Sequence, residues 1–342
     1  MKKKSFSLVA CLLGTLLTAC GPSAQQESET PGNIVLAYVT AGGKALPDPS
    51  VVTHINYAFG QVDSTFRRIV ISRESRLKEV AELKKKAPHL KVMLSIGGWG
   101  SGRFSEMAAD VTHRRLFARD CRRVVEQFGL DGIDLDWEYP TSSAAGISAS
   151  PDDTENFTQL MRDIRQAIGP DRLLTLASVA GAAYIDFRAI DPYVDFVNIM
   201  AYDMARPPYH HSALHPSPLS RYSAAQAVQA HLDAGVAPEK LVLGVPFYGH
   251  AAPPMSDFIR YDSLMARRDY VQCWDTVACV PYLADSTGRL VASYENPESL
   301  AAKCAYVREQ GLLGIMYWEY NSDDAQGSLR EAVYRHMRPQ QP

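Results

Sequence analysis

Apolar residues along this chain form short runs that are separated by longer segments with helical periodicity. The short runs are rich in β-branched and aromatic residues and are bounded by turn residues, which is typical of buried strands. Eight such runs lie at 33–40, 52–60, 91–99, 132–139, 173–180, 194–203, 241–249 and 312–320. Apolar residues spaced three and four apart predict helices at about 73–86, 113–128, 153–168, 223–234, 298–310 and 326–337.

Strands that alternate with helices favour parallel pairing through right-handed crossovers. Eight such strands close most naturally into a barrel, so the sequence predicts an α/β fold of the (β/α)8, or TIM barrel, type. The first connection, residues 41–51, is too short and Pro-rich for a full helix. Residues 250–297 are too many for a simple loop and predict a small insertion after the seventh strand.

The N-terminal segment has the pattern of an export signal. Three lysines at positions 2 to 4 precede an apolar stretch, residues 6–17, which is too short to span a bilayer. "LTAC", residues 17–20, resembles the lipobox of bacterial lipoproteins, which implies acylation of Cys20; the alternative is ordinary signal cleavage beside a free cysteine. The predicted organisation is a lipoprotein signal peptide at 1–19, a flexible polar tether at 20–31 and a catalytic barrel at 32–338.

The composition is that of an ordinary soluble globular protein. Of the 342 residues, 46% are hydrophobic and 21% charged, and the net charge of -3 disfavours nucleic acid as a partner. Cys121 and Cys304 fall on apolar helical stripes and are expected in the core. Cys273 and Cys279 lie close together in an exported chain, so either a local disulfide or two free thiols is open.

"DGIDLDWEYP", residues 131–140, crowds four acidic side chains into an apolar run. Alternate residues of a strand share a face, so three of the acids point into the barrel and the apolar residues between them point outward. The inward acids are Asp134, Asp136 and Glu138, and the outward residues are Ile133, Leu135 and Trp137. We expect Glu138 at the C-terminal mouth, where barrel enzymes build their active sites. Asp131, at the strand entry, is expected to be structural.

Buried like charges disfavour ionisation, so at least one of these acids is expected to hold a proton at neutral pH. The alternatives are a charge-satisfied barrel interior and a divalent metal site. A metal needs ligands that gather around one point from several elements, which a column on one strand provides poorly. We therefore predict a catalytic site without a metal or other cofactor.

The motif DGxDxDxE in "DGIDLDWE" resembles the signature of family 18 glycoside hydrolases, the chitinases and their relatives. Further segments resemble the family's motifs on the third, sixth, seventh and eighth strands. They are "SIGGW" (95–99), "MAYD" (200–203), "GVPFYG" (244–249) and "GIMYWEY" (314–320). These segments occur in the family's order at barrel spacing, so the resemblance covers nearly all of residues 33–337.

The resemblance implies retaining, substrate-assisted catalysis. The 2-acetamido oxygen of N-acetylglucosamine attacks C1 to give an oxazolinium intermediate, while Glu138 acts first as acid and then as base. By the same resemblance, Asp136 orients the acetamido N–H and Asp134 shares a proton with Asp136. Tyr202 donates its hydroxyl to the acetamido oxygen, and Asp203 helps to hold the distorted sugar.

Sugar rings present apolar C–H faces, so a saccharide cleft requires aromatic platforms. The resemblance places Trp318 under the cleaved sugar and Trp99 beyond the scissile bond. Four residues near strand ends are expected either to line the floor or to pack in the core: Tyr38, Phe59, Met200 and Tyr248. Three histidines in "HHSALH" invite a zinc interpretation, but contact with sugar hydroxyls or loop packing is favoured for His210, His211 and His215.

The sequence thus predicts an exported, membrane-anchored hydrolase of the bacterial envelope, monomeric, acting on chitin or chito-oligosaccharides. Two alternatives stay open: an endo-β-N-acetylglucosaminidase acting on the N-glycan chitobiose core, and a non-catalytic lectin on the same barrel. Lectins of this family generally lack the final acid of the motif, and Glu138 is present. The insertion is shorter than the module of deep-cleft processive members, which favours an open groove and endo-acting cleavage.

Overall fold

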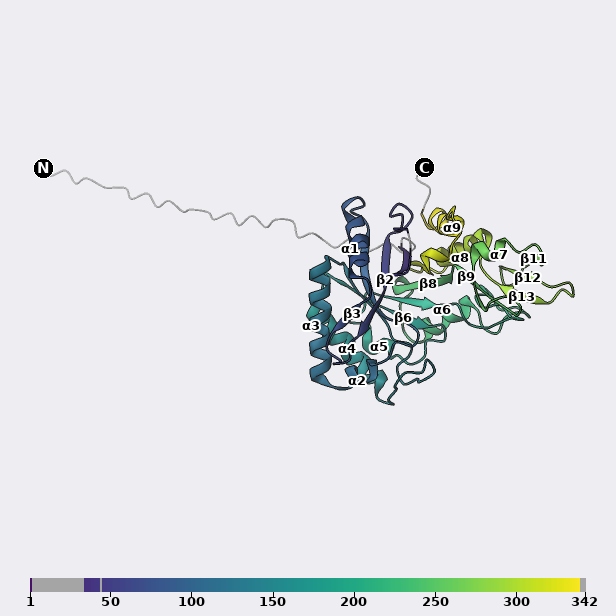
Figure 1. The fold of residues 1–342 in the computed structure, drawn as a ribbon. Coiled ribbons are helices and arrows are strands. Elements are labelled where there is room, and N and C mark those ends of the chain that lie inside the picture. Colours follow the sequence, from purple (N-terminus) through teal and green to yellow (C-terminus); the bar gives the residue numbers. More distant parts are fainter. Residues whose placement is uncertain (2–33, 44, 339–342) are drawn as a thin grey trace.

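The computed structural model describes Met1, residues 34–43 and residues 45–338 (Figure 1). The expected signal peptide, the tether and Cys20 therefore lie outside the described residues, as does the first residue of the first predicted strand. Among the helices of the described part, none combines the length and the apolar character that a bilayer crossing requires.

Eight parallel strands close into a barrel, which confirms the predicted fold. Their order is β1-β2-β4-β5-β6-β7-β8-β14, and β14 pairs with β1 to close the circle. The bounds are β1 Ile34–Thr40, β2 His54–Val62, β4 Lys91–Gly97, β5 Gly132–Asp136, β6 Leu173–Val179, β7 Phe196–Met200, β8 Leu241–Pro246 and β14 Gly314–Trp318. Most strands are shorter than predicted, because the apolar runs continue into the loops at the barrel mouth.

Helices cover the barrel at nearly the predicted positions. They are α1 Glu74–Glu82 with η1 Leu83–Lys85, α3 Val111–Phe128, α4 Asp153–Ile168, α6 Ala224–Asp233, α8 Pro297–Glu309 and α9 Ser328–Met337. The described residues of the first connection, 41–43 and 45–51, form no helix, as expected. Four short elements were not predicted: α2 Phe104–Ala109, α5 Phe187–Ile190, η2 Pro238–Lys240 and η3 Tyr320–Ser322. A short strand, β3 Ile69–Ile71, was also missed and pairs antiparallel with the end of β2.

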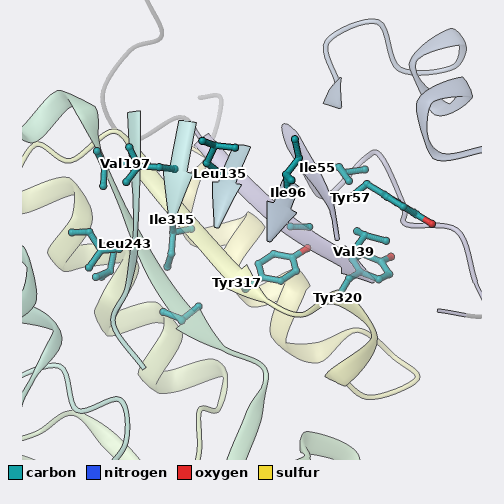
Figure 2. Close-up of a cluster of buried hydrophobic side chains, with 14 of the residues drawn as sticks. Val39, Ile55, Tyr57, Ile96, Leu135, Val197, Leu243, Ile315, Tyr317 and Tyr320 are labelled. Carbon is teal, nitrogen blue, oxygen red and sulfur yellow. The ribbon is translucent and has the colours of Figure 1, made fainter. Parts of the chain in front are cut away.

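The side chains on the two faces of the barrel strands belong to two different apolar clusters. Outward-facing side chains such as Leu135, Ile315 and Leu243 pack between the barrel and its helices (Figure 2). The inward-facing cluster includes Met93 and Met316 and fills the barrel interior. Burial of both faces explains why each strand reads as a nearly continuous apolar run. Because the interior is mostly apolar, its few polar residues are candidates for a functional role.

The insertion after the seventh barrel strand is a five-stranded antiparallel sheet, ordered β10-β9-β13-β12-β11. Its elements are β9 Tyr248–Ala251, β10 Phe258–Arg260, α7 Tyr261–Met265, β11 Val271–Asp275, β12 Val280–Ala284 and β13 Leu290–Ser293. The predicted strand 241–249 is thus two strands, because the chain leaves the barrel at Pro246 and enters the second sheet at Tyr248. In Figure 1 this sheet projects to one side of the barrel, away from α1 and α3.

The cysteines of the described residues are free thiols. Cys121 and Cys304 are buried, as predicted. Cys273 and Cys279 do not form the disulfide that their spacing left open. Cys273 lies opposite Tyr282 in the β11–β12 ladder, whereas Cys279 belongs to the turn that joins these strands, so the two thiols do not face each other across the hairpin.

Candidate active site

The acidic column occupies β5, between β4 and β6. Asp134 is in register with Ser95 on one side and Thr175 on the other, and Asp136 is in register with Gly97. A side chain on Gly97 would bring its Cβ to 2.0 Å from the carbonyl oxygen of Asp136. The φ angle of Gly97 is also +130°, which side-chain-bearing residues rarely adopt. This glycine of "SIGGW" therefore allows β4 to lie close against the column.

Asp134, the lowest acid of the column, is fully buried and accepts four hydrogen bonds. Its donors are the hydroxyls of Tyr38 at 2.8 Å, Ser95 at 2.7 Å and Thr175 at 2.6 Å, and the amide of Asn198 at 3.2 Å. Burial raises the pKa of Asp134, and these four hydrogen bonds oppose the rise. The carboxylate is therefore a satisfied polar anchor inside the barrel.

Asp136, the middle acid, has the opposite environment. Its side chain is 4% exposed, yet its Oδ1 atom has no hydrogen-bond partner. Burial raises the pKa of Asp136 well above its ordinary value, and the charges of Glu138 and Asp134 raise it further. The four hydrogen bonds of Asp134 come from neutral donors, and the sharing of a proton between Asp134 and Asp136 stays a prediction.

Glu138, the top acid, lies two residues beyond the end of β5 and faces a cavity. Burial raises the pKa of Glu138 to about 7; a hydrogen bond with Tyr139 works against this rise, and the charge of Asp203 adds to it. A carboxyl group with this pKa can deliver a proton near neutral pH and take one back in the next step.

The cavity lies at the C-terminal ends of the barrel strands and has a volume of about 260 Å³. All the predicted site residues of the described chain line it except Asp134, which lies below the floor. The predicted lining residues are Tyr38, Phe59, Trp99, Asp136, Glu138, Met200, Tyr202, Asp203, Tyr248 and Trp318. Five more residues, which were not predicted, complete the lining: Tyr139, Ala177, Val179, Ala180 and Met204.

Aromatic rings form the apolar floor and one edge of this cavity. The ring of Trp318 is stacked on Phe59, with centroids 5.5 Å apart and an interplanar angle of 20°, and lies 5.7 Å from Tyr38. Trp99 is 65% exposed at the rim, where its ring meets Tyr139 edge-on at 6.4 Å. Trp318 is therefore held rigidly, whereas Trp99 presents most of its surface to solvent.

Tyr202 and Asp203 follow β7, which is separated from the acidic column on β5 by a single strand, β6. Burial raises the pKa of Tyr202, so its hydroxyl keeps its proton as a donor. No described residue is hydrogen-bonded to that hydroxyl. Gly244 leaves room for the ring, because an added Cβ would lie 2.2 Å from the carbonyl oxygen of Ile199 and 3.1 Å from the Tyr202 ring.

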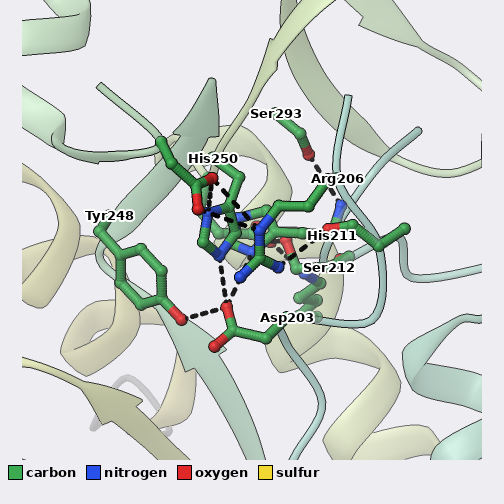
Figure 3. Close-up of polar contacts among 11 residues, drawn as sticks. Asp203, Arg206, His211, Ser212, Tyr248, His250 and Ser293 are labelled. Carbon is green, nitrogen blue, oxygen red and sulfur yellow. Dashed lines mark hydrogen bonds and ion pairs between the residues drawn. The ribbon is translucent and has the colours of Figure 1, made fainter. Parts of the chain in front are cut away.

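Asp203 is held by side chains of the second sheet and of a neighbouring loop (Figure 3). Its Oδ1 atom accepts hydrogen bonds from the hydroxyl of Tyr248 at 2.5 Å and from Nε2 of His250 at 2.7 Å. Nδ1 of His211 lies 3.6 Å from the same oxygen. Burial alone would raise the pKa of Asp203, but the contacts with His211, His250 and Tyr248 lower it well below its usual range.

The histidines of "HHSALH" pack inside the loop. His210 is buried and lies 3.2 Å from Asp275, and His215 packs edge-on against Tyr306. The ligand-type atoms of Asp203, His211 and His250 lie within 4.8 Å of one another, so this group could in principle gather around a cation. Oδ1 of Asp203 already accepts hydrogen bonds from Tyr248 and His250, which favours a network of protein groups over a cation site.

Sequence reasoning missed His250 and Asp257 near Asp203 and Tyr139 beside Glu138, whereas Tyr248 was among the predicted site residues. Tyr139 was not among the predicted site residues; β5 ends at Asp136, and the chain beyond it brings Tyr139 into the cavity lining. His250 and Asp257 belong to the insertion, whose folding back toward "MAYD" has no local signal. The histidine directly after "GVPFYG" was the one available hint.

Comparison with known proteins agrees with this site. The family model described as "Glycosyl hydrolases family 18" matches residues 24–323. Chitinase A1 of Niallia circulans is 34% identical over 298 residues, which cover 72% of this chain but only 42% of that protein. Chitotriosidase-1 of Mus musculus is 30% identical over 330 residues, covering 82% of this chain and 69% of that protein.

Solved structures give the same result. A family 18 N-acetylglucosaminidase from Paenibacillus barengoltzii superposes with a TM-score of 0.82 and 35% sequence identity, covering 89% of this chain and 99% of that one. Group IV chitinase of Ostrinia furnacalis superposes with a TM-score of 0.81 and 27% identity, covering 89% of this chain and 99% of that one. The fold of this chain is thus shared with solved structures of family 18 enzymes over 89% of its length.

Proposed function

This chain belongs to family 18 of the glycosyl hydrolases and is a chitinase-like enzyme, and from that premise we propose that it cleaves β-1,4 bonds after N-acetylglucosamine in chitin or its oligomers. The reaction proceeds with retention and is assisted by the substrate's own acetamido group. The observation that carries the proposal is Glu138, a carboxyl group with a pKa of about 7 that faces a cavity floored by Trp318.

The first step breaks the glycosidic bond. A sugar lies over Trp318, and Glu138 gives its proton to the glycosidic oxygen while the acetamido oxygen forms a bond to C1. The leaving sugar departs with that proton as a hydroxyl, and the remaining sugar carries the positive charge as an oxazolinium ring. In the second step water attacks C1, the ring opens, and the carboxylate of Glu138 takes the water's proton.

The other polar groups of the cavity fit the acetamido group and not a protein nucleophile. Asp136 lines the cavity and its carboxyl group is an acceptor for the acetamido N–H, and the hydroxyl of Tyr202 is a donor for the acetamido oxygen. Asp203 is occupied by Tyr248 and His250, so it holds the sugar and does not attack it. The cavity therefore offers one proton-transferring carboxyl group and leaves the nucleophile to the substrate.

The test is hydrolysis of a hexamer of N-acetylglucosamine, with the anomer of the first product followed by NMR. The proposal expects initial β-anomer and little cleavage of the deacetylated hexamer. Initial α-anomer, or equal cleavage of the deacetylated substrate, would contradict it. A thiazoline mimic of the oxazolinium ring should inhibit strongly, and failure to inhibit would contradict substrate assistance.

The size of the products separates two modes of action. The Paenibacillus barengoltzii relative is an N-acetylglucosaminidase, which favours release of single sugars as a second candidate. The rim position of Trp99, 65% exposed beyond the cavity, favours binding of further sugars and internal cleavage instead. Dimers and trimers as first products of the hexamer support internal cleavage, and monomers alone support the second candidate.

The export and anchoring of the enzyme rest on the sequence. Acylation of Cys20 within "LTAC" would attach the monomeric barrel to a membrane through the polar residues that follow. An alkyne-labelled fatty acid should be incorporated by the wild type during expression in a bacterium and not by Cys20→Ala. Equal labelling of the two, or no labelling of either, would overturn the lipid anchor and leave the hydrolase proposal intact.

A further inference from the structure

The imidazole ring of His250 lies between two carboxylates. Its Nε2 atom is 2.7 Å from Oδ1 of Asp203, and its Nδ1 atom is 2.8 Å from Oδ1 of Asp257. The ring itself is 3% exposed. Both distances are those of well-formed hydrogen bonds, and an ionised carboxylate can only accept. Each ring nitrogen of His250 therefore faces a group that requires a donor.

A neutral imidazole carries one N–H group and can satisfy only one of these two carboxylates. A proton on Asp203 or Asp257 would resolve the mismatch, but both have independent reasons to stay ionised. Asp203 also accepts a hydrogen bond from Tyr248 at 2.5 Å. Asp257 has a side chain that is 63% exposed to water and lies 3.2 Å from Arg206. The additional proton thus belongs on the ring.

We propose that His250 is an imidazolium ion held between Asp203 and Asp257, and that it acts as a positioning residue which keeps Asp203 ionised and fixed toward the cavity. The consequence for catalysis rests on the proposed function, whereas the protonation state of the ring does not. His250 and Asp257, both from the insertion, thereby take part in the active site without lining its cavity.

The groups around the ring are consistent with one positive charge at this place. His211 packs edge-on at a centroid distance of 4.8 Å and is fully buried. Burial lowers the pKa of His211 to about 4, with the charge of His250 as a further cause, so His211 stays neutral. The remaining titratable or charged neighbours are Asp203, Asp257, Tyr248 and Arg206, which carry the charges already described.

The loop that carries His211 is itself fixed, so the network is rigid on that side. The backbone N–H of His211 donates to the hydroxyl of Ser293 on β13 at 3.1 Å. Ser212 donates to Glu295 at 2.5 Å, and Glu295 forms a fully buried ion pair with Lys303. Asp203 is therefore held from two sides, by the loop that carries His211 and by the insertion that carries Tyr248 and His250.

The direct test is NMR of histidine selectively labelled with ¹⁵N. At pH 7 one ring is expected with both nitrogens protonated, and its signals should vanish in His250→Gln. In Asp257→Asn a smaller fraction of the His250 rings should carry both protons at pH 7, because one of the two flanking negative charges is removed. A ring of His250 with a single protonated nitrogen at pH 6 and pH 7 would overturn the proposal.

Asp262→Asn is the matched control, since Asp262 is another partly exposed aspartate of the insertion, paired with Arg260 at 3.2 Å and not with a histidine. It should leave the ring signals unchanged. The kinetic arm uses the N-acetylglucosamine hexamer. In His250→Gln the acid limb of the kcat profile should move to higher pH, because Asp203 loses a contact that lowers its pKa.

The two arms separate the possible failures. An acid limb that stays in place while kcat falls equally at every pH would show a merely structural role for His250 and would contradict the proposal. If the wild type does not cleave the hexamer at all, the proposed function fails. The NMR measurement still decides the protonation of His250 in that case, since it needs no substrate.

Discussion

Two carboxyl groups face the same cavity from β5 and β7, two strands apart in the barrel, and are held in opposite states. Glu138 lies two residues beyond the end of β5, and burial raises its pKa to about 7. Asp203 follows β7, and its contacts with His211, His250 and Tyr248 keep its pKa well below the usual range despite burial. One of the two therefore stores a proton, while the other carries a fixed negative charge.

The difference shows that the surroundings of a carboxyl group, and above all its hydrogen bonds, decide whether it serves as an acid or as a fixed charge. A carboxyl group that is deprived of donors binds its proton more tightly and becomes a general acid. A carboxyl group that is surrounded by donors is ionised and oriented, which suits holding a strained sugar. The column below Glu138 repeats the contrast, because Asp134 accepts four hydrogen bonds whereas Oδ1 of Asp136 accepts none.

The largest effect is expected for Glu138→Gln. The amide cannot donate an acidic proton, so kcat on the N-acetylglucosamine hexamer should fall by about 10³-fold. Binding of the hexamer, measured by calorimetry, should persist because the aromatic floor is unchanged. Glu126→Gln, on the exposed surface of α3, is the control and should be fully active. A Glu138→Gln variant that retains a tenth of the activity would break the distinction between the two carboxyl groups.

Asp203→Asn should lower kcat by roughly 10²-fold, as expected when a positioning group is lost. It should also destabilise the fold by about 1 kcal/mol, because Tyr248 and His250 lose the carboxylate that accepts their hydrogen bonds. Urea unfolding checks this, with Asp152→Asn, an exposed residue, as the control. A variant as stable as the wild type would show that these bonds contribute nothing to the fold.

Replacing the less exposed of the two cavity tryptophans should weaken hexamer binding more than replacing the more exposed one. Trp318→Ala removes a stacked floor residue and should weaken hexamer binding by about 2 kcal/mol, or about 30-fold. Trp99→Ala should weaken it by only about 0.7 kcal/mol, or roughly threefold, since the ring is 65% exposed. Trp274→Ala, in β11 and outside the cavity lining, is the control. An equal effect of the first two substitutions would contradict the assigned floor.

The last prediction concerns the dependence of stability on pH. The pKa of Glu138 is raised in the folded state, so the folded protein binds a proton more tightly than the unfolded chain. The wild type should therefore gain stability as the pH falls from about 7 to about 4.5, the ordinary range of a glutamate. Glu138→Gln should lack this part of the dependence in urea unfolding between these pH values. Parallel curves for the two proteins would contradict the raised pKa.

Local signals in the sequence were sufficient for the barrel and for the acidic column of the site. Each barrel strand is buried on both faces, so its apolar run is visible without any knowledge of its partners. The column on β5 is visible for the same reason, because alternation places Asp134, Asp136 and Glu138 on one face.

The contacts that hold Asp203 could not be derived from local signals in the sequence. The support of Asp203 comes from β9, from the loop at His211 and from Asp257, which are separated from it by 8 to 54 positions in the chain. Such contacts depend on how the second sheet folds back on the barrel, which no periodicity records. Cys273 and Cys279 illustrate the same limit, since they are near in sequence but remain free thiols that do not face each other in the hairpin.

The protonation of Glu138 is the most direct test of the account. Infrared difference spectra between the wild type and Glu138→Gln isolate its carboxyl band. The account predicts a protonated C=O band at pH 6 that gives way to carboxylate bands as the pH passes about 7. Carboxylate bands alone from pH 5 to pH 8 would contradict it, because Glu138 and Asp203 would then hold the same ionised group.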